Sequence, residues 1–145
     1  MTVMYRKILV ALENSPADTG LLQHVGQLAA RLGSELLLLH VADGFAARNF
    51  DQLKLAESEE MKVDREYLEA AAGKLRADGL KVSVQLALGN PPAEILKAAA
   101  KESCDIIAMA GHGHRLVGDI IHGSTINEVR HATTIPVLLV RAEKK

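Results

Sequence analysis

Short apolar runs alternate along the chain with longer stretches in which apolar residues recur every three or four positions. The runs predict strands and the stretches predict amphipathic helices, because one face of a helix repeats with this spacing. Runs without polar alternation are typical of strands buried on both faces of a parallel sheet. We predict strands at 7–12, 35–41, 81–88, 105–110 and 135–141. The helices between them are predicted to begin near Ser15, Asp51, Asn90 and Asp119.

The first helix has a clear start signal in the sequence. Ser15 is expected to cap the helix, and Pro16 suits the first helical position. Asp18 then places a negative charge at the positive end of the helix dipole. The third helix is expected to begin in the same manner, at Asn90 followed by Pro91.

Two of the strands carry the marks of sheet edges. Apolar and polar residues alternate in 81–88, which predicts one wetter face. Pro136 lies within 135–141 and cannot donate to a strand ladder, which places that strand at an edge as well. Five strands alternating with four helices predict an α/β fold, a three-layer α/β/α arrangement with a parallel sheet in the order 3-2-1-4-5. Strands one and four then meet where the winding reverses, and open α/β sheets bind ligands beyond the carboxyl ends of such strands.

Composition narrows the possible functions. The 145 residues suit one domain, which we expect to span 1–145. The net charge of −1 and the 3% aromatic content argue against a basic or base-stacking surface, so we expect no nucleic-acid partner. The chain has no apolar run long enough for a membrane span or an export signal, so we expect no membrane partner. A single cysteine, together with the lack of an export signal, predicts a cytoplasmic protein.

The segment from Met109 to Thr125 is the most informative in the chain. A glycine-rich loop after a parallel strand lets backbone amides approach an anion closely. Gly123 and Ser124 are expected to add an unhindered amide and a hydroxyl donor, while His114 and Arg115 add positive charge. The alternative is that the glycines only shape a turn. A P-loop is absent, as is G-x-G-x-x-G after the first strand, which excludes two common nucleotide-binding classes.

These residues resemble the nucleotide motif of the universal stress proteins, and the resemblance covers essentially the whole chain. The family motif is a glycine, two residues, a second glycine, nine residues, and a glycine followed by Ser or Thr. The same spacing here joins Ala110, in place of the first glycine, to Gly113 and then to Gly123 and Ser124. Further similarity to the family's strands and its closing helix lies in the segments 7–10, 39–41 and 131–141.

The resemblance implies the adenine nucleotide alpha hydrolase-like fold, a homodimer, and ATP as the ligand, with or without Mg. It also implies that Glu13, where the family usually has Asp, contacts adenine or ribose, and that Val41 offers its backbone to adenine. AMP or another adenine nucleotide is left open as the ligand. The residues expected to bind the nucleotide are Ala11, Glu13, Val41, Met109, Ala110, Gly113, His114, Arg115, Gly123, Ser124 and Thr125.

The leading hypothesis is therefore a homodimeric regulator or sensor of the stress response, with no catalytic residue assigned. One alternative is a protein-interaction module of the same fold that binds no nucleotide, with Ala110 and Glu13 marking a degraded site and an unknown protein as partner. A second alternative is a slow ATPase. The last strand, which begins at Ile135 and ends at Arg141, is apolar and exposes unpaired backbone if it lies at an edge. We expect the dimer to form through this strand.

The histidines and the cysteine have simpler explanations than a metal site or a reactive thiol. No carboxylate or cysteine completes a zinc-type spacing, so we assign no metal and interpret the histidines as facing solvent or phosphate. Cys104 precedes a buried strand and is interpreted as a packing residue. The six histidines are His24, His40, His112, His114, His122 and His131.

Overall fold

A parallel sheet in the order β3-β2-β1-β4-β5 is the centre of the fold. The computed structural model describes residues 4–42, 54–111 and 117–141, and the side chains of these residues except in 54–60 and 117–124. All four neighbouring strand pairs run parallel, which confirms the predicted order. The strands are β1 (Lys7–Leu12), β2 (Glu35–Ala42), β3 (Val82–Leu88), β4 (Ile106–Gly111) and β5 (Val137–Arg141).

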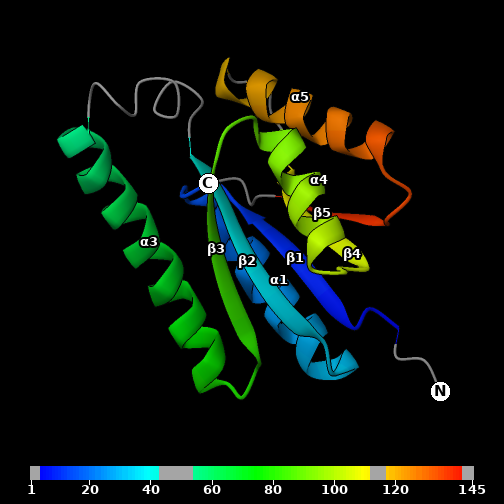
Figure 1. Cartoon of the computed structure of the whole chain (residues 1–145). Helices are drawn as coiled ribbons and strands as arrows, with labels where there is room; N and C mark the ends of the chain where they lie inside the picture. Colours follow the sequence, from blue (N-terminus) through cyan, green and yellow to red (C-terminus); the bar gives the residue numbers. More distant parts are fainter. Residues whose placement is uncertain (1–3, 43–53, 112–116, 142–145) are drawn as a thin grey trace.

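Helices cover both faces of this sheet. Figure 1 shows α1 behind the sheet and α4 and α5 in front of it. Side chains of α3 share a buried cluster with those of α1, so α3 covers the same face as α1. The helices are α1 (Ala17–Leu32), α3 (Lys54–Ala77), α4 (Pro91–Lys101) and α5 (Val117–Ala132).

The apolar run of β2 has no polar alternation because both faces of this strand are buried. Leu36 and Leu38 are buried in the cluster under α1 and α3, whereas Leu37 and Leu39 are buried in the cluster under α4 and α5. Successive side chains of a strand point to opposite faces, and here each face is covered by helices. Apolar residues are therefore required at each position from Leu36 to Leu39, which confirms the interpretation made from the sequence.

The edge strands also behave as predicted, with one difference. The exposed Ser83 lies on β3 beside Val82 and Val84, which face the cluster under α1 and α3. Ala87, expected on the wetter face, is instead buried against the side chains of α4. A small residue fits there because the helix covers this part of the edge strand.

Element boundaries differ from the predictions at several points, of which three concern two helix starts and the last strand. The N-cap of α1 is Pro16 and not Ser15, whose hydroxyl accepts a hydrogen bond from the Ala17 N–H at 3.3 Å. The helix α5 begins at Val117, two residues before the predicted start. The strand β5 begins after Pro136, whose carbonyl accepts from the Ile107 N–H at 3.0 Å. Proline has no N–H of its own to donate to the ladder.

Cys104 is a packing residue, as expected. It is 5% exposed and lies in the cluster between the sheet and α4. Burial raises the pKa of the Cys104 thiol to about 11, although the positive charge of Lys7 opposes this shift. The thiol is therefore almost entirely protonated near neutral pH, and the thiolate is the reactive form.

We predict that Cys104 reacts with iodoacetamide only slowly in the folded protein. Because the pKa of the thiol is raised to about 11, the rate should rise about tenfold per pH unit from pH 7 toward that value. Unfolding in denaturant should restore the rate of a free thiol at the same pH. Rapid labelling of the native protein at pH 7, followed by mass spectrometry, would contradict a packing role.

Candidate functional site

A cavity of about 200 Å³ lies at the carboxyl ends of β1 and β4, where the winding of the sheet reverses. Ala11 and Met109 are register partners on these two strands, and both line the cavity. Other walls come from the end of β2 and from α4 and α5. The lining residues are Ala11, Leu12, Glu13, Leu39, His40, Val41, Pro91, Ile95, Met109, Ala110, Thr125 and Ile126.

The structure brings together part of the residue set predicted from the sequence. The residues of that set that line the cavity are Ala11, Glu13, Val41, Met109, Ala110 and Thr125. The other members of the predicted set are not among the lining residues. Gly113, His114 and Arg115 lie outside the described residues, and Gly123 and Ser124 lie in α5 with their side chains outside the description.

Gly123 lies within α5, which begins at Val117. Its expected role as a backbone amide donor to the ligand stays a prediction.

The cavity wall combines apolar surfaces with a few polar groups. Leu39, Val41 and Met109 supply aliphatic and thioether surface, while Glu13 and Thr125 supply oxygen atoms. No Phe, Tyr or Trp is among the lining residues of the described part of the chain. An apolar slot with a few convergent polar groups suits a flat organic ring with polar edges. The ring would be held by aliphatic contacts and not by stacking on aromatic side chains.

The turn between β1 and α1 is held by the carboxylate of Asp18, which is only 1% exposed. Its Oδ1 accepts a hydrogen bond from the backbone N–H of Glu13 at 3.0 Å. Its Oδ2 accepts from the N–H groups of Asn14 at 2.8 Å and Ser15 at 3.4 Å, and from the hydroxyl of Tyr67 on α3. A buried carboxylate requires such donors, and they fix the turn in return.

The same turn positions the side chain of Glu13. Asn14 has a φ of 64°, in the left-handed region that asparagine tolerates better than most residues. The chain therefore turns sharply at Asn14, between Glu13, which lines the cavity, and the start of α1. The Ser15 hydroxyl donates to the Glu13 Oε1 at 3.1 Å, which restricts the carboxylate further.

His40 is a polar cavity residue that the sequence analysis did not assign to the nucleotide site. Its Nδ1 lies 2.9 Å from the carbonyl oxygen of Leu12, which can only accept, so Nδ1 carries the hydrogen. Its Nε2 lies 3.7 Å from the Oδ2 of Asp64 on α3. The Oδ1 of Asp64 accepts from the side-chain amide of Asn14 at 3.1 Å. A polar network thus runs from the cavity to α3.

Some of these residues had a weak signal in the sequence. The Ser15-x-x-Asp18 spacing before an apolar helix face is typical of a capping box, in which the acidic side chain reaches back to an earlier N–H. This accounts for the contact of Asp18 with Ser15 but not for its contacts with Glu13 and Tyr67. Asp64 and Tyr67 lie in a long polar helix and have no local signal at all.

The histidines form no metal site in the part of the chain that the structure describes. No group of three His, Cys, Asp or Glu side chains able to hold a metal occurs there. His24 and His131 are exposed, and the side chains of His112, His114 and His122 lie outside the description. Within the same ranges, no helix has the length and apolar character needed to cross a membrane.

Comparisons of the sequence and of the structure with known proteins all match universal stress proteins. The family model described as "Universal stress protein family" matches residues 4–141. Universal stress protein MJ0577 of Methanocaldococcus jannaschii is 31% identical over 158 aligned positions, which cover 97% of this chain and 98% of the relative. The solved structure of MJ0577 has a TM-score of 0.85 at 29% identity, covering 99% of this chain and all of that one.

Two further solved structures carry a named ligand. The universal stress protein from Archaeoglobus fulgidus in complex with dAMP has a TM-score of 0.69 at 22% identity, covering 94% of this chain and 98% of that one. A universal stress protein in complex with cAMP has a TM-score of 0.69 at 18% identity, covering 96% and 98% of the two chains. At these identities the likeness is one of fold.

We predict that Asp18→Ala lowers the free energy of unfolding by about 2–4 kcal/mol, because several buried donors lose a charged acceptor. Asp18→Asn, which keeps one accepting oxygen, should lower it less. In native-state hydrogen exchange, the Glu13 and Asn14 amides should lose protection in Asp18→Ala.

Asp105→Ala is the matched control for this experiment. The Asp105 carboxylate accepts from the Arg6 N–H at 2.8 Å and the Lys7 N–H at 3.0 Å, at the other end of β1. This variant should leave the exchange of the Glu13 amide unchanged. Equal exchange of that amide in wild type and Asp18→Ala would show that Asp18 does not hold the turn.

Proposed function

The chain belongs to the universal stress protein family, and from this membership we propose that it binds ATP in the cavity at the ends of β1 and β4. We further propose that it acts as a homodimeric regulator or sensor of the stress response. The observation that carries the proposal is the meeting of Glu13, Val41 and Ala110 around one apolar cavity. The family resemblance assigns nucleotide contacts to these positions, and the fold gathers them from three different strand ends.

The size of the cavity favours the adenosine end of the ligand as its occupant. Pockets that enclose a whole small molecule usually measure about 300–1,000 Å³. A cavity of about 200 Å³ suits a purine and part of its sugar. The phosphates would extend beyond it, and the family motif assigns them to the segment that contains Gly113 and Ser124.

The proteins of the same fold that are known with dAMP and with cAMP support this assignment. Those two ligands share an adenine base and a phosphorylated sugar, and ATP contains both. The apolar wall formed by Leu39, Val41 and Ile95 offers no charge to the base. Discrimination among bases would therefore come from the polar edge of the cavity, where Glu13 is held in place by the Ser15 hydroxyl.

We predict that the purified protein binds ATP in isothermal titration and that Glu13→Ala weakens binding about tenfold, the effect of losing one charged hydrogen bond. Glu35→Ala is the matched control, because Glu35 begins β2 at the opposite end of the sheet, 3.7 Å from the Lys81 amine. AMP, cAMP and GTP titrated in parallel would distinguish recognition of adenosine from recognition of the triphosphate.

No binding of any adenine nucleotide at millimolar concentration would overturn the proposed ligand. The interaction module without nucleotide would then be favoured, in keeping with the departures at Glu13 and Ala110. Release of phosphate from ATP that disappears in Glu13→Ala would instead favour the slow ATPase.

The homodimer is proposed to form through β5, which lies at the edge of the sheet. Leu139 on this strand is 46% exposed, which is unusual for a large apolar side chain in the middle of a strand. An unpaired apolar edge favours association, and a two-fold axis would pair the same strand of two subunits.

We predict that Leu139→Lys shifts a dimer toward monomer in size-exclusion chromatography with light scattering at micromolar concentration. Burying a new positive charge across a two-fold axis places two like charges close together. Val63→Lys is the matched control, because Val63 is 57% exposed on α3, away from β5. A dimer that persists in Leu139→Lys, or that also dissociates in Val63→Lys, would argue against an interface at β5.

A further inference from the structure

The helix α3 contacts the turn that carries Glu13, although none of the described cavity-lining residues belongs to α3. Asp64 contacts Asn14 on this turn, and Tyr67 contacts Asp18, the residue of α1 that holds the turn. Farther along, α3 is joined to the sheet at a third point. There Arg76 donates from Nε and Nη2 to the carbonyl of Val82, at 3.1 and 2.7 Å.

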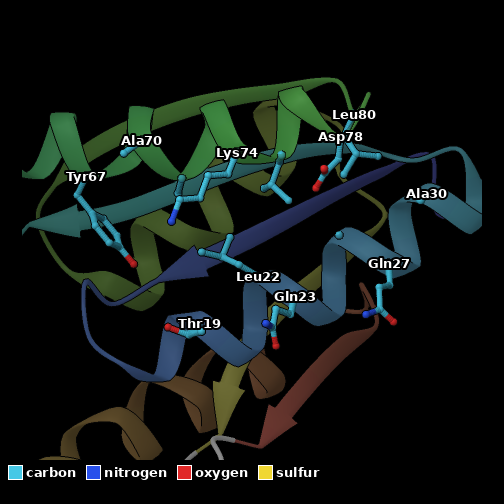
Figure 2. A pocket seen from close by; sticks show the side chains of 13 residues that line it. Thr19, Leu22, Gln23, Gln27, Ala30, Tyr67, Ala70, Lys74, Asp78 and Leu80 are labelled. Atoms are coloured by element: carbon cyan, nitrogen blue, oxygen red, sulfur yellow. The ribbon is translucent and has the colours of Figure 1, made fainter.

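The first contact is the Tyr67 hydroxyl on the Asp18 carboxylate. Figure 2 shows Tyr67 reaching from α3 toward the start of α1, near Thr19. Burial, followed by the hydrogen bond to Asp18, raises the pKa of Tyr67 well above its ordinary value. The hydroxyl therefore stays protonated and donates to the carboxylate throughout the neutral range. Tyr67 supplies Asp18 with the one donor that does not come from the turn itself among the hydrogen bonds described.

The second contact joins α3 to the turn and to a cavity-lining residue of β2. Asp64 accepts from the Asn14 amide with one oxygen, and its other oxygen lies 3.7 Å from the His40 Nε2. His40 lines the cavity from β2, while Asn14 follows Glu13 on the turn. The side chains of Asp64 and His40 are each 13% exposed, so water screens this pair only partly.

We propose that α3 is a positioning element of the nucleotide cavity, with Tyr67 and Asp64 holding the turn of Glu13 in its binding conformation. This proposal rests on the proposed function for its ligand, and it adds a helix that the family motif does not include. Tyr67 and Asp64 are positioning residues, because neither is among the cavity-lining residues: Tyr67 acts on the turn through Asp18, and Asp64 acts on it through Asn14.

The physical basis is the conformational freedom of the turn, which is greater without the contacts from α3 than with them. Without the Tyr67 hydroxyl, Asp18 keeps its backbone donors but loses its tie to α3, and the turn samples more conformations. The apparent dissociation constant rises in proportion as the binding-competent fraction falls. Linkage is reciprocal, so a nucleotide that needs this turn conformation also strengthens the attachment of α3 by the same factor.

The same contact of Tyr67 also links the nucleotide cavity to a groove on the surface. A groove of about 840 Å³ lies between α1 and α3, and Tyr67 is one of its lining residues (Figure 2). Tyr67 therefore contacts Asp18, which holds the turn, through its hydroxyl, and it also lines the groove. Nucleotide binding would thus affect the surface between α1 and α3 through the side chain of Tyr67.

The test compares Tyr67→Phe and Asp64→Ala with Arg76→Met in the full chain. The first two remove contacts of α3 with the turn and should each weaken ATP binding about fivefold, within the usual range of coupling between sites. They should also accelerate amide exchange at Glu13 and Asn14 without nucleotide. Arg76→Met removes the bonds at the far end of α3 and should change neither quantity, even where it lowers the melting temperature.

Each outcome decides between positioning and general stability. Equal ATP affinity and equal Glu13 exchange in Tyr67→Phe and wild type would overturn the proposal, as would an Arg76→Met variant that reproduces both effects. A wild-type protein that binds no ATP would overturn the proposed ligand, and amide exchange alone would then support or overturn the positioning of the turn. ATP that slows amide exchange in α3 of the wild type, but not of Tyr67→Phe, would support the reciprocal coupling.

Discussion

A single buried carboxylate, that of Asp18, holds the part of the fold on which the cavity depends. It accepts hydrogen bonds from the N–H groups of Glu13 and Asn14 and from the hydroxyl of Tyr67. Burying a charge is unfavourable unless donors surround it, and its place in the first turn of α1 adds the positive end of a helix dipole. The two backbone donors belong to the turn after β1, so the hydrogen bonds that stabilise the charge also fix the shape of the turn.

The place of the cavity follows from the winding of the sheet. The helix α1, which follows β1, covers one face of the sheet, and α5, which follows β4, covers the other, so ligands are expected at the strand ends between them. The apolar runs that bury the sheet on both sides continue to the strand ends. Leu39 and Met109 therefore belong to the buried core and line the cavity at once. The wall of the site is therefore an extension of the core.

Much of this arrangement could be predicted from local patterns. Pro136 and the alternation in β3 placed the edges of the sheet, and the strand order followed. Glu13, Val41 and Ala110 meet at the cavity because each lies at or just beyond the carboxyl end of its strand. The patterns were less reliable at element ends. The helix α5 begins two residues before its predicted start, and β5 begins after Pro136 and not at Ile135.

The sequence by itself therefore determined the strand order, the two-sided core and the position of the cavity, because periodicity, caps and turn residues act over a few neighbouring positions. Only the tertiary structure decided that Tyr67 meets Asp18 across 49 positions of chain and that Asp64 meets Asn14 across 50. Such pairs depend on how α3 lies against α1 and the sheet. No local rule specifies that angle, since it results from the packing of many side chains together.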